Sequence, residues 1–389
     1  MKKIFIAGTF DILHPGHLNL IKQAESLGNF LIAVIARDQN VIKTKGQPPF
    51  YSETERLKNL ESLGLVDKVV LGDLNNPYKI IKDEQPDIIA LGYDQQQYVN
   101  GLHDFKINSP LNYKIESLKP FKEDFCKGRN LRKAFEDSRA GFLLIDKPED
   151  WTSHDAVAKL RSLTGVRQIG HTGTLDPFAT GLLICALGSA TKMVGLFDLL
   201  PKEYEAAIRL GLTSDTYDRT GEIKNSKFEI RNLKQIPMTK IQNVLKSFVG
   251  RQKQLPPMYS AKKVGGKKLY ELARQGKEIE RKPSEIEIYE IELLKVEDGN
   301  LRAESQHTTF NIRVACSTGT YIRTLAHEIG QKLGTGAVSQ ELKRTAIGDF
   351  KLTEAVNLSQ VTKENWSDFL IKPAEALQII NRQYLKNNF

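Results

Sequence analysis

Short apolar runs alternate with amphipathic stretches in the first third of the chain. The apolar runs are Ile4–Ala7, Phe30–Ala36, Lys68–Leu71 and Asp87–Leu91, and the helical stretches are Pro15–Leu27 and Ser52–Leu63. Continuous apolar runs are typical of parallel strands that are buried on both faces. Ser52 with Glu55 three residues later is a capping-box signature for a helix start. This alternation predicts an α/β domain with a doubly wound parallel sheet.

A different pattern begins at Gly141, where a fresh apolar strand follows the charge-rich stretch Lys119–Arg139. That stretch is interpreted as a terminal helix that runs into a linker. The chain then mixes alternating strands with longer helical patterns, which predicts an α+β arrangement. The strands are expected at Tyr204–Leu210 and Asn311–Cys316, and the helices at His154–Leu163 and Tyr321–Leu333. We therefore expect two different domains, residues 1–139 and 140–389.

Length and composition agree with two globular domains. The chain has 389 residues, of which 40% are hydrophobic and 26% charged, as is normal for soluble protein. No apolar run approaches the roughly 18–20 residues of a membrane helix, and the N-terminal run is too short for a signal peptide. The three cysteines lie far apart, without zinc spacing or a disulfide framework. A cytoplasmic protein without a resident metal is expected.

The charge distribution favours a polyanionic partner for the second domain. The net charge is +9, and residues 1–140 hold 20 Lys and Arg against 18 Asp and Glu, so most of the excess lies beyond them. Within Arg251–Lys282 there are ten basic residues and three acidic ones. A nucleic-acid surface and ordinary surface solubilisation are both consistent with this charge.

A pair of histidines opens the first predicted helix. His14-Pro15-Gly16-His17 follows a buried strand and the turn Gly8-Thr9-Phe10-Asp11. Backbone N–H groups at a helix start favour phosphate. Two imidazoles three residues apart share one face of the first turn, where they can donate to phosphate oxygens during transfer at phosphorus. The alternative is a pair of capping histidines, which the strand–turn context disfavours.

Residues 1–135 resemble the cytidylyltransferase-like nucleotidyltransferases, among them glycerol-phosphate cytidylyltransferases and archaeal-type FAD synthetases. The resemblance rests on Gly8–His17 and on the blocks Ala36-Arg37-Asp38, Glu55-Arg56 and Leu91–Gln95. It implies that ATP or CTP binds with Mg²⁺. The residues it assigns to the nucleotide are Thr9, Phe10, His14, His17, Lys43 and Asp94, with Lys43 on the loop after the second strand. A departure is Cys126–Arg132, which lacks the family's Ser/Thr-rich block.

A single carboxylate stands out in the second domain. Asp176 lies in Gly170-His171-Thr172-Gly173-Thr174-Leu175-Asp176-Pro177, a loop dense in Gly, Thr and Pro. A residue before Pro is biased to extended backbone, which presents the side chain from a loop. An Asx turn or helix cap is the alternative. Tyr204 can offer a ring face, and Arg323, which follows a small-residue loop into a helix, can pair with the aspartate.

Residues 140–360 resemble the tRNA pseudouridine synthase B family. The matching blocks are Gly141–Pro148, Thr152-Ser153, Gly170–Gly181, Lys202-Glu203-Tyr204, Leu255–Ala261, Lys267–Tyr270 and Thr318–Leu325. The resemblance implies a mixed, largely antiparallel sheet and conversion of uridine 55 in the tRNA T-loop to pseudouridine, without a cofactor. It makes Asp176 the nucleophile or base, with Tyr204 stacking on the base and Arg323 pairing with Asp176. His171 would enter the T-loop, and Lys147 and Tyr321 would support the pocket.

The basic segment Arg251–Lys282 is then expected to close over the RNA backbone through Lys262, Lys263, Lys267 and Lys268. Only 37 residues follow Phe350-Lys351-Leu352, which we expect to be too few for the further RNA-binding domain of many bacterial members. Three hypotheses remain open. Both domains are enzymes; or the first is an inactive nucleotide-binding or RNA-docking module; or the second is a tRNA chaperone. No obligate protein partner is indicated.

Overall fold

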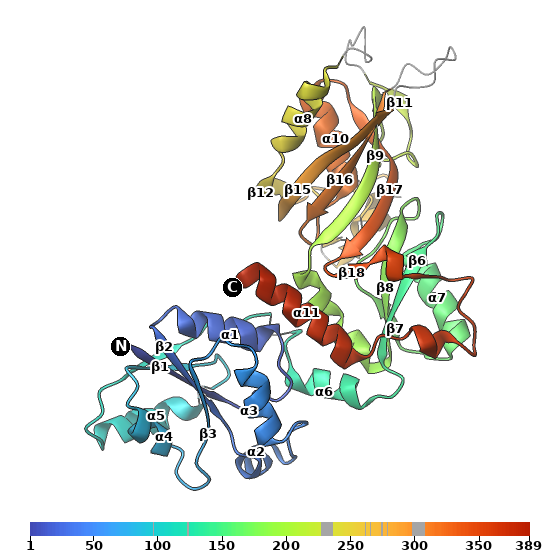
Figure 1. Ribbon diagram of the computed structural model, residues 1–389. Coiled ribbons are helices and arrows are strands. Elements are labelled where there is room, and N and C mark those ends of the chain that lie inside the picture. The colour runs from blue at the N-terminus through green and yellow to red at the C-terminus, as the bar shows by residue number, and fades with distance from the viewer. Residues whose placement is uncertain are drawn as a thin grey trace. The chain divides into compact units, whose positions relative to one another are not determined.

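The computed structural model describes the whole chain except Gln96, Glu123, 227–235, Ala261, Gly265, Arg274, Glu278 and 298–307. It divides into two compact units (Figure 1). Unit 1 comprises Met1–Ser138 together with Pro373–Phe389, and unit 2 comprises Arg139–Lys372. The sequence pattern had grouped the final helix with the second domain, whereas the contacts of this helix group it with unit 1.

Unit 1 is built on a five-stranded sheet in the order β3-β2-β1-β4-β5. Every neighbouring pair in it is parallel. The strands are β1 (Lys3–Gly8), β2 (Phe30–Ile35), β3 (Lys68–Leu71), β4 (Ile88–Leu91) and β5 (Lys114–Ser117). The apolar side chains of β1, β2 and β4 are buried, as continuous apolar runs require. The predicted doubly wound parallel sheet is confirmed.

The helices of unit 1 include one from the far end of the chain. They are α1 (Pro15–Glu25), α2 (Asp38–Lys45), α3 (Glu53–Glu61), α4 (Lys79–Glu84), α5 (Gln97–Ile107), α6 (Gly128–Glu136) and α11 (Pro373–Asn388). The capping box of Ser52 and Glu55 is present at the start of α3. Asn19 Nδ2 on α1 donates to the Tyr384 hydroxyl on α11 at 3.0 Å. Asn381 Nδ2 on α11 donates to the Leu13 carbonyl at 3.0 Å.

Unit 2 is built on a mixed, mostly antiparallel sheet, also as predicted. Its path is β12-β15-β16-β9-β17-β8-β6-β19, with β18 and β7 beside it. Of the described pairs, β17–β8 and β19–β6 are parallel and the others antiparallel. The strands are β6 (Gly141–Lys147), β7 (Ile169–His171), β8 (Thr180–Leu187), β9 (Lys202–Leu210), β12 (Gly250–Gln254), β15 (Ser284–Glu297), β16 (Thr309–Cys316), β17 (Ala337–Ile347), β18 (Phe350–Lys351) and β19 (Val356–Asn357).

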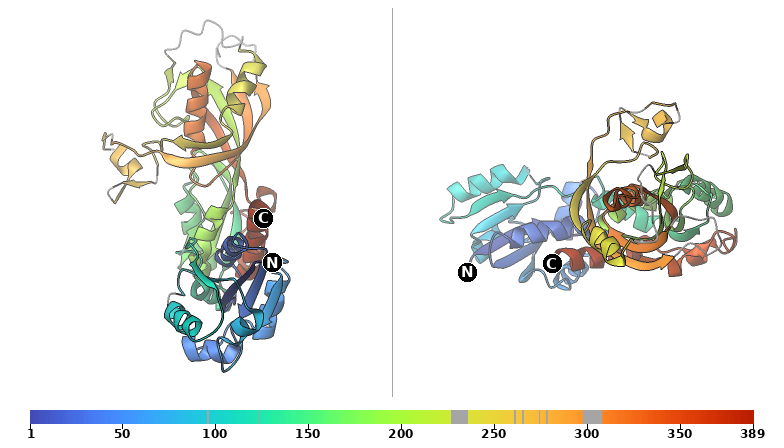
Figure 2. Two further views of the ribbon diagram at one scale, coloured as in Figure 1. Left: turned by 90° about the vertical axis from the view of Figure 1, so that its left-hand side faces the viewer. Right: turned by 90° about the horizontal axis from the view of Figure 1, so that it is seen from above.

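Two small ladders and several helices complete unit 2. The ladders are β10 (Leu212–Thr213) with β11 (Lys224–Asn225), and β13 (Lys263–Val264) with β14 (Lys267–Lys268). The helices are α7 (Ser153–Thr164), α8 (Met238–Lys246), α9 (Leu269–Ala273), α10 (Ile322–Leu333) and the 3-10 helices η1 (Gly188–Leu199), η3 (Leu352–Glu354) and η4 (Trp366–Phe369). The strands of the sheet curve around α10 (Figure 2, right). Among the described helices, none has the length and apolarity needed to cross a bilayer.

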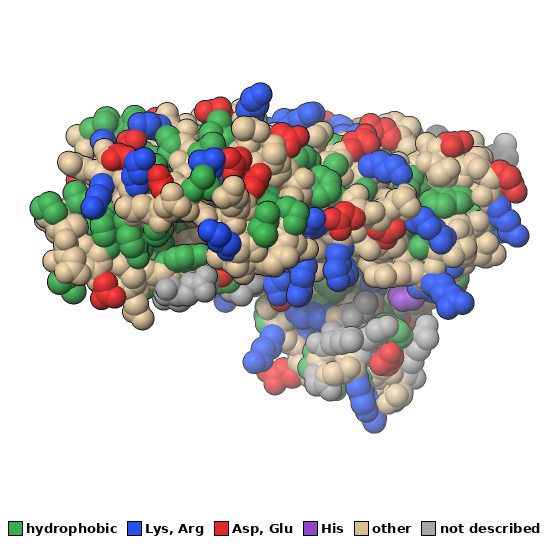
Figure 3. Space-filling view, turned by 90° about the horizontal axis from the view of Figure 1, so that it is seen from below, with side chains coloured by type: hydrophobic (Ala, Val, Ile, Leu, Met, Phe, Trp, Pro, Cys, Tyr) green, Lys and Arg blue, Asp and Glu red, His purple; other side chains and the backbone are tan. Residues whose placement is uncertain are grey.

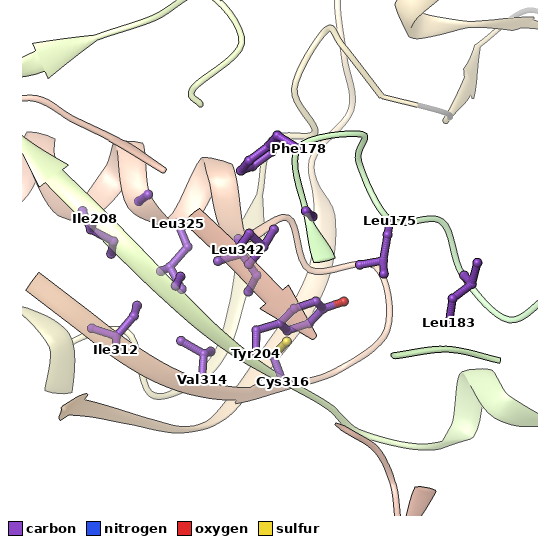
Figure 4. Close-up of a cluster of buried hydrophobic side chains, with 14 of the residues drawn as sticks. Leu175, Phe178, Leu183, Tyr204, Ile208, Ile312, Val314, Cys316, Leu325 and Leu342 are labelled. Atoms are coloured by element: carbon purple, nitrogen blue, oxygen red, sulfur yellow. The ribbon is translucent and has the colours of Figure 1, made fainter. Parts of the chain in front are cut away.

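One large apolar cluster forms the core beneath the sheet of unit 2. Tyr204 belongs to it, and its hydroxyl points toward the segment that carries Leu175 (Figure 4). The ring therefore packs among apolar neighbours, while its hydroxyl points toward the loop that precedes β8 (Figure 4). This places one aromatic side chain of the core beside the loop that carries Asp176.

Candidate active site

The loop between β7 and β8 carries Asp176 and is fastened to the start of α7. Ser153 Oγ accepts from the Leu175 N–H at 2.9 Å and donates to the Leu175 carbonyl at 3.2 Å. The Asp150 N–H donates to the Pro177 carbonyl at 2.9 Å. Thr152 and Asp155 form a capping box that fixes the same helix start. The residue that presents the carboxylate is thus held on both sides by backbone hydrogen bonds.

Lys147 lies beneath this loop with no exposed surface. Its ammonium donates to the carbonyls of Pro148 at 2.8 Å, Trp151 at 2.6 Å and Pro177 at 3.2 Å. Burial lowers the pKa of Lys147 to about 8, an effect that the negative charge of Asp176 opposes. Lys147 therefore links the backbone after β6 to the loop that carries Asp176.

Arg323 on α10 holds the Asp176 carboxylate by two contacts. Its Nη2 donates to Oδ1 at 3.0 Å, and its Nε lies 2.8 Å from Oδ2. The guanidinium is almost fully buried, whereas the Asp176 side chain is 33% exposed. Nη2 also donates to the Tyr259 carbonyl at 2.9 Å. The buried guanidinium of Arg323 thus orients the Asp176 carboxylate, while part of that carboxylate remains accessible to a ligand.

A second carboxylate, which the sequence did not single out, completes this cluster. Asp218 Oδ2 lies 3.3 Å from Arg323 Nη1, and Nη1 also donates to the Thr216 carbonyl at 3.1 Å. Burial raises the pKa of Asp176, Arg323 opposes that rise, and the like charge of Asp218 adds to it. The ionised form of Asp176 therefore depends on the guanidinium beside it.

Tyr204 and Tyr321 lie at the ends of elements that meet here. Burial raises the pKa of both phenols, so both are protonated at neutral pH. Tyr321 is the N-cap residue of α10. Its N–H donates to Gln254 Oε1 at 2.8 Å, and its carbonyl accepts from Gln254 Nε2 at 3.1 Å. This two-way bond joins the end of β12 to the start of the helix that carries Arg323.

His171, at the end of β7, lies edge-on to His154 with 5.7 Å between the ring centroids. Burial and the neighbouring His154 lower the pKa of His171 to about 4. The imidazole is therefore neutral at pH 7. A neutral ring can stack on a nucleobase without carrying a charge into the base stack.

Part of the basic segment Arg251–Lys282 projects from the sheet as β13, β14 and α9 (Figure 2). Lys262 Nζ donates to Ser284 Oγ at 2.6 Å, and Lys267 is exposed. The side chains of Lys263 and Lys268 lie outside what the structure describes. On the face drawn in Figure 3, basic and acidic side chains are interspersed. Charge alone therefore does not outline a nucleic-acid surface on that face.

A separate cleft of about 1080 Å³ lies in unit 1 at the carboxyl ends of its strands. All six residues assigned to the nucleotide line it: Thr9, Phe10, His14, His17, Lys43 and Asp94. Lys43 lies within α2 rather than on the loop that the sequence predicted, because the helix begins directly after β2. Cys126 and Arg132 of the altered block also line the cleft.

The two histidines of this cleft are stacked, with ring centroids 3.9 Å apart. Each has a buried Nδ1 without a hydrogen-bond partner among the described residues. Burial lowers the pKa of His14 well below its ordinary value and that of His17 to about 4. Both rings are therefore neutral at pH 7 and can act as N–H donors.

Two further side chains near this cleft escaped the sequence-based assignment of contacts: Lys45 lines it, whereas Arg56 does not. Lys45 Nζ donates to Thr9 Oγ1 at 2.9 Å. Arg56 is fully buried and donates to the carbonyls of Thr9, Ala36 and Tyr51 and to Asp38. Arg56 thereby joins the loops after β1 and β2. The Glu55-Arg56 block had drawn attention to it, but only the fold shows that it is structural.

Three family models match the chain. "TruB family pseudouridylate synthase (N terminal domain)" matches residues 161–322, and "tRNA pseudouridylate synthase B C-terminal domain" matches 323–378. The tRNA pseudouridine synthase B of Clostridium tetani is 42% identical over 242 residues, which are 62% of this chain and 79% of that protein. The chain belongs to the tRNA pseudouridine synthase B family. It is accordingly an enzyme, an isomerase of the pseudouridine synthase class.

A second relative gives the same result. The tRNA pseudouridine synthase B of Geobacillus thermodenitrificans is 43% identical over 238 residues, 60% of this chain and 77% of its own. Among solved structures, a Cbf5-Nop10-Gar1 complex is 28% identical with a TM-score of 0.43, over 66% of this chain and 64% of that one. The "Cytidylyltransferase-like" model matches residues 5–141, so this tRNA pseudouridine synthase B family member carries such a domain in front.

The model "tRNA pseudouridylate synthase B C-terminal domain" covers the last helices and strands of unit 2. It contains α10 and β17 and reaches into the start of α11. The segment that this tRNA pseudouridine synthase B model matches begins at Arg323 itself, within the sheet-and-helix body of unit 2.

Proposed function

We propose that unit 2 converts uridine 55 in the T-loop of tRNA to pseudouridine, with Asp176 as the catalytic nucleophile or base. The observation that carries the proposal is the accessible Asp176 carboxylate, held on a braced loop by the buried Arg323 at 2.8 and 3.0 Å. Family membership supports a tRNA substrate. A tRNA substrate in turn agrees with a cytoplasmic site of action.

The reaction breaks the bond between N1 of the base and C1′ of the ribose, turns the base and joins C5 to C1′. The proton on C5 leaves and N1 gains one, so the product is an isomer. Asp176 either bonds to C1′ and is displaced again, or takes up a proton. Either role needs the ionised carboxylate, which Arg323 favours. Tyr204 supplies a ring on which the base stacks and a hydroxyl beside the leaving proton. No redox or group-transfer cofactor enters these steps.

The uridine must leave its stack before it can reach Asp176, which costs a few kcal/mol. A neutral His171 that enters the T-loop would fill the vacated position, and stacking on Tyr204 would offset part of the cost. Lys262, Lys263, Lys267 and Lys268 would bind the phosphate backbone, and Lys147 and Tyr321 would support the pocket. The projecting position of β13 and β14 supports this contact.

The test of this proposal is Asp176→Asn, assayed on an unmodified tRNA transcript. We expect pseudouridine formation to be abolished and the dissociation constant of the tRNA to stay nearly unchanged, since the loop keeps its backbone bonds. Glu341→Gln removes an exposed carboxylate of β17 and serves as the matched control with full activity. Normal turnover by Asp176→Asn refutes the assignment. Retained RNA binding with no turnover by the unaltered chain supports a chaperone instead.

For unit 1 we propose binding of ATP or CTP with Mg²⁺ and transfer of a nucleotidyl group. The cleft fits a triphosphate, because it offers two orphaned buried imidazole nitrogens, a helix start, Lys43 and Lys45. Thr9, Phe10 and Asp94 would complete the contacts. Bound Mg²⁺ would neutralise phosphate charge, while His14 and His17 donate to the α-phosphate.

A screen of labelled ATP and CTP with candidate acceptors, read as pyrophosphate release by the full chain, tests this second proposal. His14→Ala should abolish release and leave pseudouridine formation unchanged. Binding of nucleotide without release in any combination favours an accessory module. The residues Cys126–Arg132, which lack hydroxyl groups where the family has them, are the observation in favour of that alternative.

A further inference from the structure

Arg344 on β17 is a buried cation to which the roles above give no part. It is 1% exposed. Its Nε donates to the Leu182 carbonyl of β8 at 2.8 Å, and its Nη2 donates to the Gly173 carbonyl at 3.2 Å. Among the residues that the structure describes, no carboxylate pairs with it. A buried guanidinium without a counter-charge costs free energy, so its surroundings merit attention.

The register of the sheet sets Arg344 directly opposite Tyr204. The two are Cα partners on the antiparallel strands β17 and β9, so their side chains project from the same face. The Arg344 guanidinium and the Tyr204 phenol therefore lie side by side on that face of the sheet.

The other contact of Arg344 reaches the loop that carries Asp176. Gly173 lies three residues before Asp176 and has φ +102, a left-handed conformation that favours glycine. Its carbonyl is turned to the guanidinium by this backbone. One rigid, planar cation therefore lies opposite Tyr204 across the two strands and binds the loop that carries Asp176.

We propose that Arg344 is a positioning residue for the isomerisation, which fixes the hydroxyl of Tyr204 relative to the loop of Asp176. The inference rests on the role proposed above for Tyr204. Burial raises the pKa of Tyr204, and the positive charge of Arg344 opposes that rise.

The experiment is a double-mutant cycle of Arg344→Gln with Tyr204→Phe, with Arg344→Lys as the conservative variant. Single-turnover rate constants are measured with excess enzyme on an unmodified tRNA transcript, together with the dissociation constant of the tRNA. We expect Arg344→Gln to lower the rate constant about 10- to 100-fold, as for loss of a charge-assisted hydrogen bond. In the Tyr204→Phe background the same change should have less than about a 2-fold effect.

Lys202→Met is the matched control, because Lys202 is also a buried cation, on β9, and among the described residues it binds only carbonyls, those of Phe197 and Leu200. Its effect should be the same in both backgrounds. An equal loss from Arg344→Gln in both backgrounds overturns the proposal, as does failure of both Arg344 variants to fold. A Tyr204→Phe variant with unchanged rate refutes the role of the phenol itself, which is a separate failure.

Discussion

Arg323 and Asp218 form a buried ion pair at 3.3 Å, with 4% and 3% of their side chains exposed. Because Arg323 also binds Asp176, the two carboxylates share one cation. Asp218 accepts from Thr216 Oγ1 at 2.8 Å and from Thr220 Oγ1 at 2.6 Å, which fixes it in turn. The position of Arg323, and through it the orientation of the Asp176 carboxylate, thus depends on Asp218.

This arrangement gives a pH prediction for Asp218→Asn. The negative charge of Asp218 raises the pKa of Asp176. Its removal lowers that pKa, so the Asp176 carboxylate persists to lower pH and the acid limb of the rate profile moves down. The rate at neutral pH should fall roughly 10-fold or more, because Arg323 loses a buried partner. Single-turnover rates from pH 4 to 8 measure both effects.

Asp215→Asn is the control for that profile. Asp215 lies on the same turn but is exposed, and it accepts from the Glu222 N–H at 2.9 Å. Its profile should match that of the unaltered chain. An acid limb that stays in place for Asp218→Asn would show that Asp218 does not act on the ionisation of Asp176.

The stacked histidines of unit 1 predict acid sensitivity of that unit. The pKa of His17 is about 4 in the folded chain and 6.5 unfolded, so the unfolded state binds more protons between these values. Stability is therefore fully present above about pH 6.5 and is lost as pH falls toward 4. Calorimetric unfolding of the full chain across this range should show the decline for the unit 1 transition. His17→Gln should flatten it, and an equal decline in both proteins would contradict the prediction.

The position of α11 predicts that unit 1 depends on the end of the chain. Deletion of residues 373–389 exposes α1 and removes the buried Tyr384. The free energy of unfolding of unit 1 should therefore fall by several kcal/mol, about the amount that the burial of two large apolar side chains contributes. Calorimetry and nucleotide titration of the full and shortened chains measure the loss. Tyr384→Phe, which keeps the ring, should cost about 1 kcal/mol. An unchanged unit 1 transition after deletion is the contrary outcome.

The basic segment predicts a salt effect. Replacement of Lys262, Lys263, Lys267 and Lys268 by Gln should flatten the dependence of tRNA affinity on salt, by about one unit of slope for each lost phosphate contact. Titrations at several salt concentrations measure it. Gln at the exposed Lys351 and Lys363 is the control. An unchanged slope for the fourfold variant excludes the segment from the RNA interface.

The sequence alone predicted the elements that are determined by neighbouring residues, such as buried strands and capped helix starts. The apolar runs of β1 and β2 and the Ser52 capping box were visible in the sequence because burial on both faces and helix capping leave residue-level marks. Motif resemblance supplied Asp176, Tyr204 and Arg323. The partnership of Arg323 with Asp176 was expected from charge, but its bidentate geometry came only from the fold.

Other parts of the site leave no local mark. Asp215 and Asp218 lie three residues apart in one polar turn, and nothing in their spacing tells that one is exposed and the other 2% exposed. Arg344 lies within a run of polar residues, Lys343-Arg344-Thr345, and does not stand out among them. Its position opposite Tyr204 depends on the register between two strands that are far apart in the sequence. The contact of α11 with α1 spans more than 360 residues.

Gln254 links two elements of unit 2 that lie far apart in the sequence, β12 and α10. Its side-chain amide bonds both to the N–H and to the carbonyl of Tyr321. After Gln254 the chain continues toward the β13–β14 hairpin. Arg323 lies two residues after Tyr321, in the first turn of α10. Gln254 therefore ties the strand that leads into the β13–β14 hairpin to the start of the helix that carries Arg323, so a displacement of either element would strain these two hydrogen bonds.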